Sequence, residues 1–343
     1  MTGKLILKDG SIFNGNSFGF EESAAGEVVF STGMVGYPES FTDPSYQGQI
    51  LILTYPLIGN YGVSDKKYWE SNGLKISGLI VSNYIDTPSH FQSKGSLSDW
   101  LKSEKIPALE ISDTRLLTEK IRNKGTMLGK IILKNNIAFY DPAKDNLLEK
   151  VSIKKVETLG IGNKTILMLD CGAKANIQRC ILKRNVKLII VPYNFDPFKN
   201  KINFDGILIS NGPGDPKTAI QTIKIIKKSI ERKIPTFGIC LGNQILALAT
   251  GGDTQKLKFG HRSQNQPCIL EGTKRCFITT QNHGFEVNKI PPGFKPWFTN
   301  VNDKSNEGIM HKKLPFMSVQ FHPEAAAGPV DTEWIFDEFI KRL

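Results

Sequence analysis

A cysteine flanked by two glycines is the side chain in this sequence best placed for covalent chemistry. Residues 235–244 read PTFGICLGNQ, an apolar run that passes through Gly-x-Cys-x-Gly into residues with helical spacing. This is the thiol counterpart of the Gly-x-Ser-x-Gly nucleophile elbow, whose glycines permit a tight turn that lifts the nucleophile above a sheet edge. The N-terminus of a helix also favours a thiolate. We therefore predict that Cys240 is a nucleophile, although a lone cysteine is more often an unreactive buried residue.

A thiolate nucleophile needs a base and a group that orients the base, and the sequence FMSVQFHPE at residues 316–324 supplies both. If residues 316–321 form a strand, His322 and Glu324 lie two apart at its end and can point to the same side. His322 would take the thiol proton and return it to a departing amine, while Glu324 holds the imidazole in the required tautomer. We interpret the remaining histidines as structural or surface residues: His90, His261, His283 and His311.

A Gly/Pro loop, ISNGPGDP at residues 209–216, follows another apolar run. Backbone N–H groups of such a loop can face a developing oxyanion, and Gly212 together with the N–H of Leu241 would form a hole with two donors. An ordinary turn closing a strand–helix unit is the alternative interpretation. The chain contains no Walker A sequence, no HExxH and no carboxylate cluster suited to a metal, so we expect neither an ATP site nor a metal site on it.

Four of these segments together, GICLGNQ, SNGPGDP, QNHGFEV and FHPE, resemble the class I (triad) glutamine amidotransferases. The resemblance implies that Cys240, His322 and Glu324 form the catalytic triad. It also implies a set of residues that bind L-glutamine: Ser45, Gly212, Gly214, Leu241, Gln244, Asn282, Gly284 and Phe285. The family usually reads C-L-G-H-Q at the elbow, whereas Asn243 stands here at the fourth position, which puts any role of that histidine in doubt.

The first half of the chain resembles the N-terminal domain of the carbamoyl-phosphate synthetase small subunit in two segments, residues 30–62 (FSTGMVGYPESFTDPSYQGQILILTYPLIGNYG) and 113–125 (DTRLLTEKIRNKG). This resemblance implies that the N-terminal domain docks on a large synthetase subunit, in a heterodimer or a higher oligomer of heterodimers. The large subunit would carry ATP and Mg and make carbamoyl phosphate from bicarbonate and ammonia, for arginine and pyrimidine biosynthesis. No cofactor is expected on this chain itself.

Two other functions stay open at this point. One is a different thiol-elbow hydrolase, such as a γ-glutamyl hydrolase or a peptidase-like enzyme, which would leave the first half of the chain unexplained. The other is a non-catalytic module that binds through a basic face, because the chain has 44 Lys+Arg against 33 Asp+Glu and a net charge of +11. Residues 164–343 hold the whole excess, with 26 basic and 15 acidic side chains against 18 and 18 in residues 1–163.

The kind of basic residue weakens the binding-module hypothesis. Of the 44 basic residues, 36 are Lys and 8 are Arg, although recognition of phosphates and guanine edges favours Arg. We therefore expect no nucleic-acid partner. No apolar run approaches the roughly 18 residues needed to span a bilayer, so we expect no membrane association either. The composition is rich in Lys, Asn and Ile, which fits compositional drift in an AT-rich genome such as that of a plastid. We therefore expect a cytoplasmic protein, or a plastid stromal one if it is organelle-encoded.

The elements that must position these residues change in character along the 343 residues. Up to about residue 140, short β-rich runs dominate, with helical patterns at 97–105 and 113–123. From residue 164, apolar runs without polar alternation are each followed by a helical pattern, as a parallel sheet covered on both faces requires. We therefore predict an α/β fold: a strand-rich mixed domain (1–150), a linker (151–163) and an amidotransferase domain (164–343) with a mostly parallel sheet flanked by helices.

Overall fold

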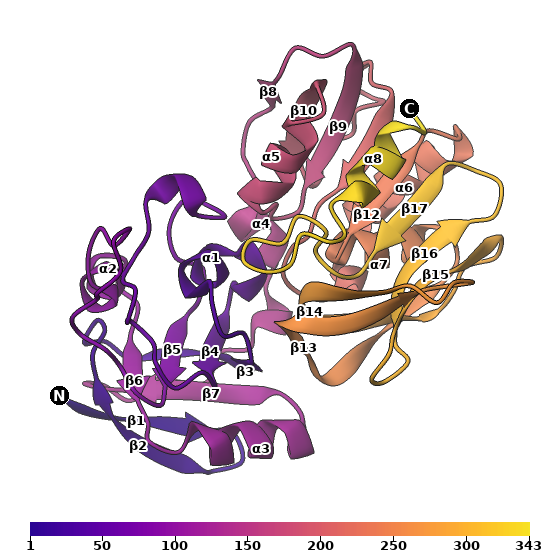
Figure 1. Ribbon diagram of the computed structural model, residues 1–343. Helices are drawn as coiled ribbons and strands as arrows, with labels where there is room; N and C mark the ends of the chain where they lie inside the picture. Colours follow the sequence, from indigo (N-terminus) through magenta and orange to yellow (C-terminus); the bar gives the residue numbers. More distant parts are fainter. The chain divides into compact units, whose positions relative to one another are not determined.

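The computed structural model describes residues 1–343 as two compact units, Met1–Asp145 and Asn146–Leu343 (Figure 1). Sequence patterning places the boundary at residue 150, followed by a linker at 151–163. In the structure α4 (Leu147–Val151) belongs to the second unit, and β8 (Glu157–Leu159) pairs antiparallel with β10 (Val186–Pro192) at the edge of its sheet. No helix reaches the length and apolar content that crossing a membrane demands.

The first unit is a closed barrel with the strand order β1-β2-β6-β5-β4-β3-β7. Strands β3, β4, β5 and β6 run parallel to one another, and β7 closes the barrel by pairing antiparallel with both β1 and β3. The strands are β1 (Thr2–Leu7), β2 (Ile12–Ser17), β3 (Ala24–Ser31), β4 (Gln49–Leu53), β5 (Gly78–Val81), β6 (Ala108–Glu110) and β7 (Met127–Ile132). The helices are α1 (Tyr37–Thr42), α2 (Leu97–Ser103) and α3 (Thr114–Lys124), with 3₁₀ turns at Pro44–Tyr46, Lys66–Tyr68 and Pro142–Lys144.

The second unit is built on a ten-stranded sheet of order β14-β13-β15-β16-β17-β12-β11-β9-β10-β8. Its parallel centre runs β17-β12-β11-β9-β10, and an antiparallel extension follows on the other side of β17. The remaining strands are β9 (Lys164–Asp170), β11 (Gly206–Ile209), β12 (Thr236–Ile239), β13 (Asp253–Leu270), β14 (Cys276–Lys289), β15 (Phe294–Asn300), β16 (Asn306–His311) and β17 (Phe316–Val319). The helices are α5 (Ala175–Leu182), α6 (Ile220–Glu231), α7 (Leu241–Ala249) and α8 (Trp334–Ile340), with a 3₁₀ turn at Pro216–Thr218.

Helices cover both faces of the parallel centre. On one face, alternate residues of β9 such as Ile166 and Met168 pack with side chains of α5 and α8. On the other face, the intervening Leu167 and Leu169 pack with α6 and α7. Because successive side chains of a strand point to opposite faces, both sets must be apolar, which explains the apolar runs of the sequence. The predicted fold class is confirmed.

Helix α6 differs in detail from its sequence pattern. The spacing of its isoleucines predicts that Ile220, Ile223, Ile226 and Ile230 form the packed side. In the structure Ile220 is 58% exposed at the first helical position, whereas Ile223, Ile226 and Ile230 pack in the core as predicted. Thr222, Ile225 and Ser229 are also buried. Thr222 donates to the Tyr193 carbonyl at 2.8 Å and Ser229 bonds Thr236 at 3.1 Å, so polar side chains share the buried face.

Candidate active site

The elbow around Cys240 is closely packed. β12 ends at Ile239 and α7 begins at Leu241, so Cys240 alone makes the turn, with φ 54° and ψ −103°. A Cβ on Gly238 would lie 2.3 Å from the Gly242 carbonyl oxygen, and one on Gly242 would lie 2.2 Å from that of Ile209. Both flanking glycines are therefore required sterically, and Cys240 holds a backbone conformation that non-glycine residues rarely adopt.

Strand pairing brings the predicted base to the same sheet edge. β17 lies beside β12 and parallel to it, with Ile239 opposite Val319, and the Cys240 N–H donates to the Val319 carbonyl at 2.9 Å. Since parallel strands end at one edge, the segment after β17 reaches the elbow. The His322 N–H donates to the Thr280 carbonyl at 2.9 Å, which fixes that segment against β14.

His322 and Glu324 form a buried pair. Their side chains meet at 2.6 Å between Nδ1 and Oε1, and both residues are at least 98% buried. Burial alone would lower the pKa of His322, but the charge of Glu324 and the neighbouring Cys240 thiol raise it overall. Burial alone would raise the pKa of Glu324, but Lys174 and His322 lower it. The bond at Nδ1 leaves Nε2 as the ring nitrogen that can exchange a proton with the thiol.

Lys174 is a member of this cluster that sequence reasoning missed. Its Nζ lies 3.1 Å from Glu324 Oε1 and donates to the Ala325 carbonyl at 2.5 Å, and the residue is 3% exposed. Its backbone N–H donates to Asn211 Oδ1 at 3.0 Å, which connects it to the Gly/Pro loop. The available signal was its position, shortly after the end of β9. Lysine at such a place is usually exposed, so the sequence alone favoured a surface role.

The predicted oxyanion loop lies against the elbow. It follows β11, the parallel neighbour of β12. A Cβ on Gly212 would lie 2.1 Å from the Cys171 carbonyl oxygen and 2.9 Å from Leu241 Cδ2, so Gly212 and Leu241 are in close proximity. Gly214 has φ 92°, which favours glycine. The N–H of Leu241 belongs to the first turn of α7, where helix N–H groups have no intrahelical acceptor.

Asn243 and Gln244 connect α7 to two strands. Gln244 Nε2 donates to the Phe285 carbonyl at 2.9 Å and to Gln320 Oε1 at 3.1 Å. Asn243 Nδ2 donates to the same Gln320 oxygen at 3.0 Å, and its Oδ1 accepts from Ser318 Oγ at 2.8 Å. Asn243 is fully buried. Asn243, which departs from the family pattern, therefore uses its amide to bond Ser318 of β17 and Gln320, the residue after that strand.

The β13–β14 hairpin carries the last group of predicted residues. The Asn282 carbonyl is 3.7 Å from Cys240 Sγ, close enough for a weak S–H···O contact. Asn282 pairs with Arg262 of β13, and a Cβ on the following Gly284 would lie 3.4 Å from an Arg262 side-chain nitrogen. Phe285 contributes the carbonyl that holds Gln244. The hairpin therefore brings the QNHGF segment to the elbow.

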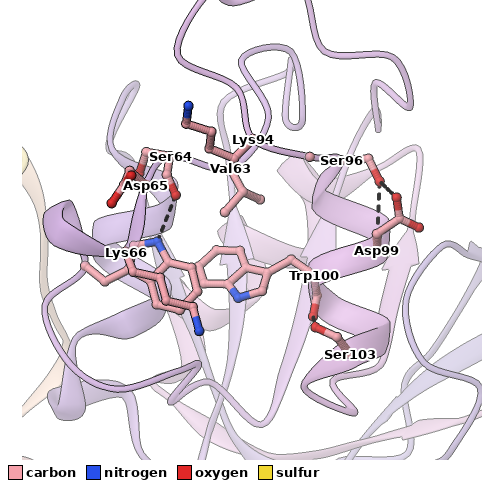
Figure 2. Close-up of a pocket in the computed structure, with 11 residues that line it drawn as sticks. Val63, Ser64, Asp65, Lys66, Lys94, Ser96, Asp99, Trp100 and Ser103 are labelled. Atoms are coloured by element: carbon pink, nitrogen blue, oxygen red, sulfur yellow. Dashed lines mark hydrogen bonds between the residues drawn. The ribbon is translucent and has the colours of Figure 1, made fainter.

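Ser45 lies in the other compact unit, separate from the ten remaining predicted site residues. It is buried in the 3₁₀ turn Pro44–Tyr46, and its N–H donates to Asp43 Oδ1 at 2.9 Å. The first unit also contains a cavity of about 600 Å³, lined by Trp100, Val63, Lys94 and neighbouring side chains (Figure 2). None of the predicted site residues lines this cavity.

Comparisons with known proteins cover both units. A family model described as glutamine amidotransferase class-I matches residues 167–342, and one described as carbamoyl-phosphate synthase small chain, CPSase domain, matches residues 5–131. Among solved structures, a glutamine amidotransferase from Thermotoga maritima has a TM-score of 0.40 and 17% identity, covering 53% of this chain and 86% of that chain.

Two curated relatives match almost the whole chain. Carbamoyl-phosphate synthase (ammonia), mitochondrial, of Homo sapiens is 48% identical over 356 residues, which cover 100% of this chain. Multifunctional protein CAD of Squalus acanthias is 49% identical over 354 residues, which cover 98% of this chain. The chain spans only 24% and 16% of the lengths of these relatives. With its elbow, its buried His–Glu pair and both family models, the chain belongs to the class-I glutamine amidotransferases, with a carbamoyl-phosphate synthase small-chain domain preceding the amidotransferase domain.

Proposed function

We propose that the chain hydrolyses L-glutamine through Cys240, His322 and Glu324. The observation that carries the proposal is the 2.6 Å His322–Glu324 contact at the sheet edge where the strained elbow holds Cys240. His322 Nε2 accepts the thiol proton while the sulfur attacks the carboxamide carbon of glutamine. The tetrahedral intermediate places its oxyanion at the N–H groups of Gly212 and Leu241.

The second half of the reaction returns the enzyme to its starting state. His322 gives its proton to the amide nitrogen, the C–N bond breaks, and ammonia leaves a glutamyl thioester on Cys240. A water molecule, deprotonated by His322, then attacks the thioester carbon, and glutamate leaves as the thiol is reprotonated. The proposed glutamine contacts are those implied by the family: Ser45, Gly212, Gly214, Leu241, Gln244, Asn282, Gly284 and Phe285.

The proposed partner is a large synthetase subunit that binds ATP and Mg. It would use the ammonia and bicarbonate to make carbamoyl phosphate, for arginine and pyrimidine biosynthesis, as part of a heterodimer or a higher oligomer of heterodimers. The match of residues 5–131 to the small-chain domain supports this proposal, because a γ-glutamyl hydrolase or a peptidase would leave the barrel unit unexplained. The proposed compartment is the cytoplasm, or the plastid stroma for an organelle-encoded chain.

A second candidate is a synthase domain that depends on free ammonia and does not hydrolyse glutamine. The name of the human relative, which specifies ammonia, favours it. The proposal of hydrolysis depends instead on residues of this chain, the thiol at the elbow and its buried base.

The complex of this chain with its large subunit, obtained by co-purification, separates the two candidates. We expect Cys240→Ser to abolish synthesis supported by glutamine while synthesis supported by ammonia continues. Cys276→Ser is the matched control, since Cys276 is exposed and outside the site, and it should leave both activities unchanged. Wild-type complex that uses ammonia but not glutamine would establish the second candidate, and glutamine use by Cys240→Ser would refute the mechanism.

A further inference from the structure

A buried cluster of metal-ligating side chains lies in the antiparallel part of the second unit, outside the proposed triad. His261 of β13 and His283 of β14 are cross-strand partners, and Glu307 is contributed by β16. One donor atom from each of the three residues lies within 4.8 Å of the other two. All three residues are buried, with exposed fractions of 7% for His261, 5% for His283 and 0% for Glu307.

Hydrogen bonds orient both imidazole rings. His261 Nε2 lies 2.7 Å from Asp303 Oδ2, and a carboxylate only accepts, so Nε2 carries a proton. His283 Nδ1 lies 2.8 Å from the Phe285 carbonyl, so Nδ1 is the donor of that ring. A carboxylate or carbonyl behind one ring nitrogen is the usual arrangement for histidines that ligate a metal through the other.

The two remaining ring nitrogens face other acceptors. His261 Nδ1 is 3.4 Å from Glu307 Oε1, and His283 Nε2 is 3.0 Å from Gln281 Oε1. In neutral rings both contacts set a lone pair against an oxygen, which is unfavourable without a cation between them. His261 Nδ1 and Glu307 Oε2 are also buried without a hydrogen-bond partner.

We propose that His261, His283 and Glu307 bind a divalent cation of the zinc class, with Gln281 Oε1 as a neighbouring oxygen donor. Two imidazole nitrogens and one carboxylate form a donor set that zinc accepts. A proton on His261 Nδ1 would satisfy the contact with Glu307 but would leave the contact between His283 Nε2 and Gln281 Oε1 unfavourable. One cation bound by His261, His283 and Glu307 would relieve both contacts. The side chain of Asp303 is 43% exposed, so solvent reaches the outer side of the cluster.

Zinc binding is measured on the full-length chain carrying Cys240→Ser and Cys276→Ser, which removes the proposed nucleophile and the exposed thiol as competing ligands. We expect one zinc per chain by elemental mass spectrometry after dialysis, and saturable binding by titration calorimetry. His261→Ala should abolish retention, and Asp303→Asn should weaken affinity by roughly 10–100-fold because it loosens the orientation of His261.

His311→Ala is the matched control, because His311 ends the same strand as Glu307 and accepts hydrogen bonds from the N–H groups of Lys313 and Leu314. It should retain zinc fully. Should His261→Ala fail to fold, the exposed Asp303→Asn variant decides the question. Absence of zinc in the chain that carries both Cys→Ser substitutions, or affinity unchanged in Asp303→Asn and His261→Ala, overturns the site. Neither result bears on glutamine hydrolysis, which is assayed with Cys240 intact.

Discussion

Replacing Lys174 by Met is expected to destabilise the buried Glu324–His322 pair of the proposed triad. The substitution keeps most of the side-chain volume but removes the charge that lies 3.1 Å from Glu324 Oε1. Both residues are at least 97% buried, so Glu324 would stay buried with His322 as its hydrogen-bond partner but without the lysine charge. Breaking a buried ion pair in this way costs about 3–5 kcal/mol. We expect a loss of that size in the free energy of unfolding at neutral pH.

The loss should depend on pH with a definite sign. Lys174 and His322 lower the pKa of Glu324 below its ordinary value of 4.5, so the ionised carboxylate stabilises the folded chain above that pH. This stabilisation disappears as the pH falls through the folded-state pKa. The difference between wild type and Lys174→Met should therefore be full at neutral pH and shrink as the pH falls below about 4.5.

Urea denaturation followed by circular dichroism between pH 2 and pH 8 measures this difference, because the predicted loss lies between the ordinary pKa of 4.5 and the folded-state pKa of about 2. Lys217→Met is the control: its ion pair with Asp253 has a similar length, 2.8 Å, but both side chains are about half exposed, so the loss should stay below about 1 kcal/mol. Displacement of Glu324 should also lower kcat for glutamine hydrolysis, by up to about 100-fold. A loss for Lys174→Met no larger than that of the control, at every pH, would refute the reasoning.

Two further substitutions test the elbow. Gly242→Ala would set a Cβ 2.2 Å from the Ile209 carbonyl oxygen, so we expect a lower melting temperature and loss of glutaminase activity. Gly95→Ala is the control, because nothing lies within 4 Å of its Cβ, and it should leave both properties nearly unchanged. A stable and active Gly242→Ala variant would contradict the packing argument. Asn243→Ala removes the buried amide that bonds Gln320 and Ser318 and should cost about 1–3 kcal/mol by thermal denaturation, with a cost near zero showing that the amide has no supporting role.

The parallel part of the second unit and the proximity of several candidate site residues could be predicted from the sequence because both depend on local patterns. Apolar runs followed by helical spacing predicted the centre of the second sheet, and the predicted residues around Cys240, His322 and Glu324 come together in the structure. Pairing between distant segments was not accessible in this way. Closure of the barrel depends on β7 meeting both β1 and β3, and no local pattern encodes that contact.

The β13–β14 hairpin and Lys174 were missed for a different reason. The hairpin buries polar side chains such as Thr279 and Gln281, which hydrogen-bond to other polar groups and therefore do not give the apolar alternation that marks a strand. Lys174 is buried because a carboxylate lies next to it. A polar residue is predicted to be exposed when the partner that allows its burial is distant in sequence. Several such pairs of the second unit lie close to the proposed site.

The position of β17 explains why the proposed site needs the whole second unit. Cys240 comes from the end of β12 and His322 from the segment after β17, and the chain between them forms the antiparallel extension β13 to β16 before it returns to the edge of β12. That extension also supplies the Asn282 carbonyl near the thiol and the Thr280 carbonyl that holds His322. The strained backbone of Cys240 is therefore fixed on three sides, by β11 through Gly242, by β17 and by β14, which is the condition under which a folded chain can retain such strain.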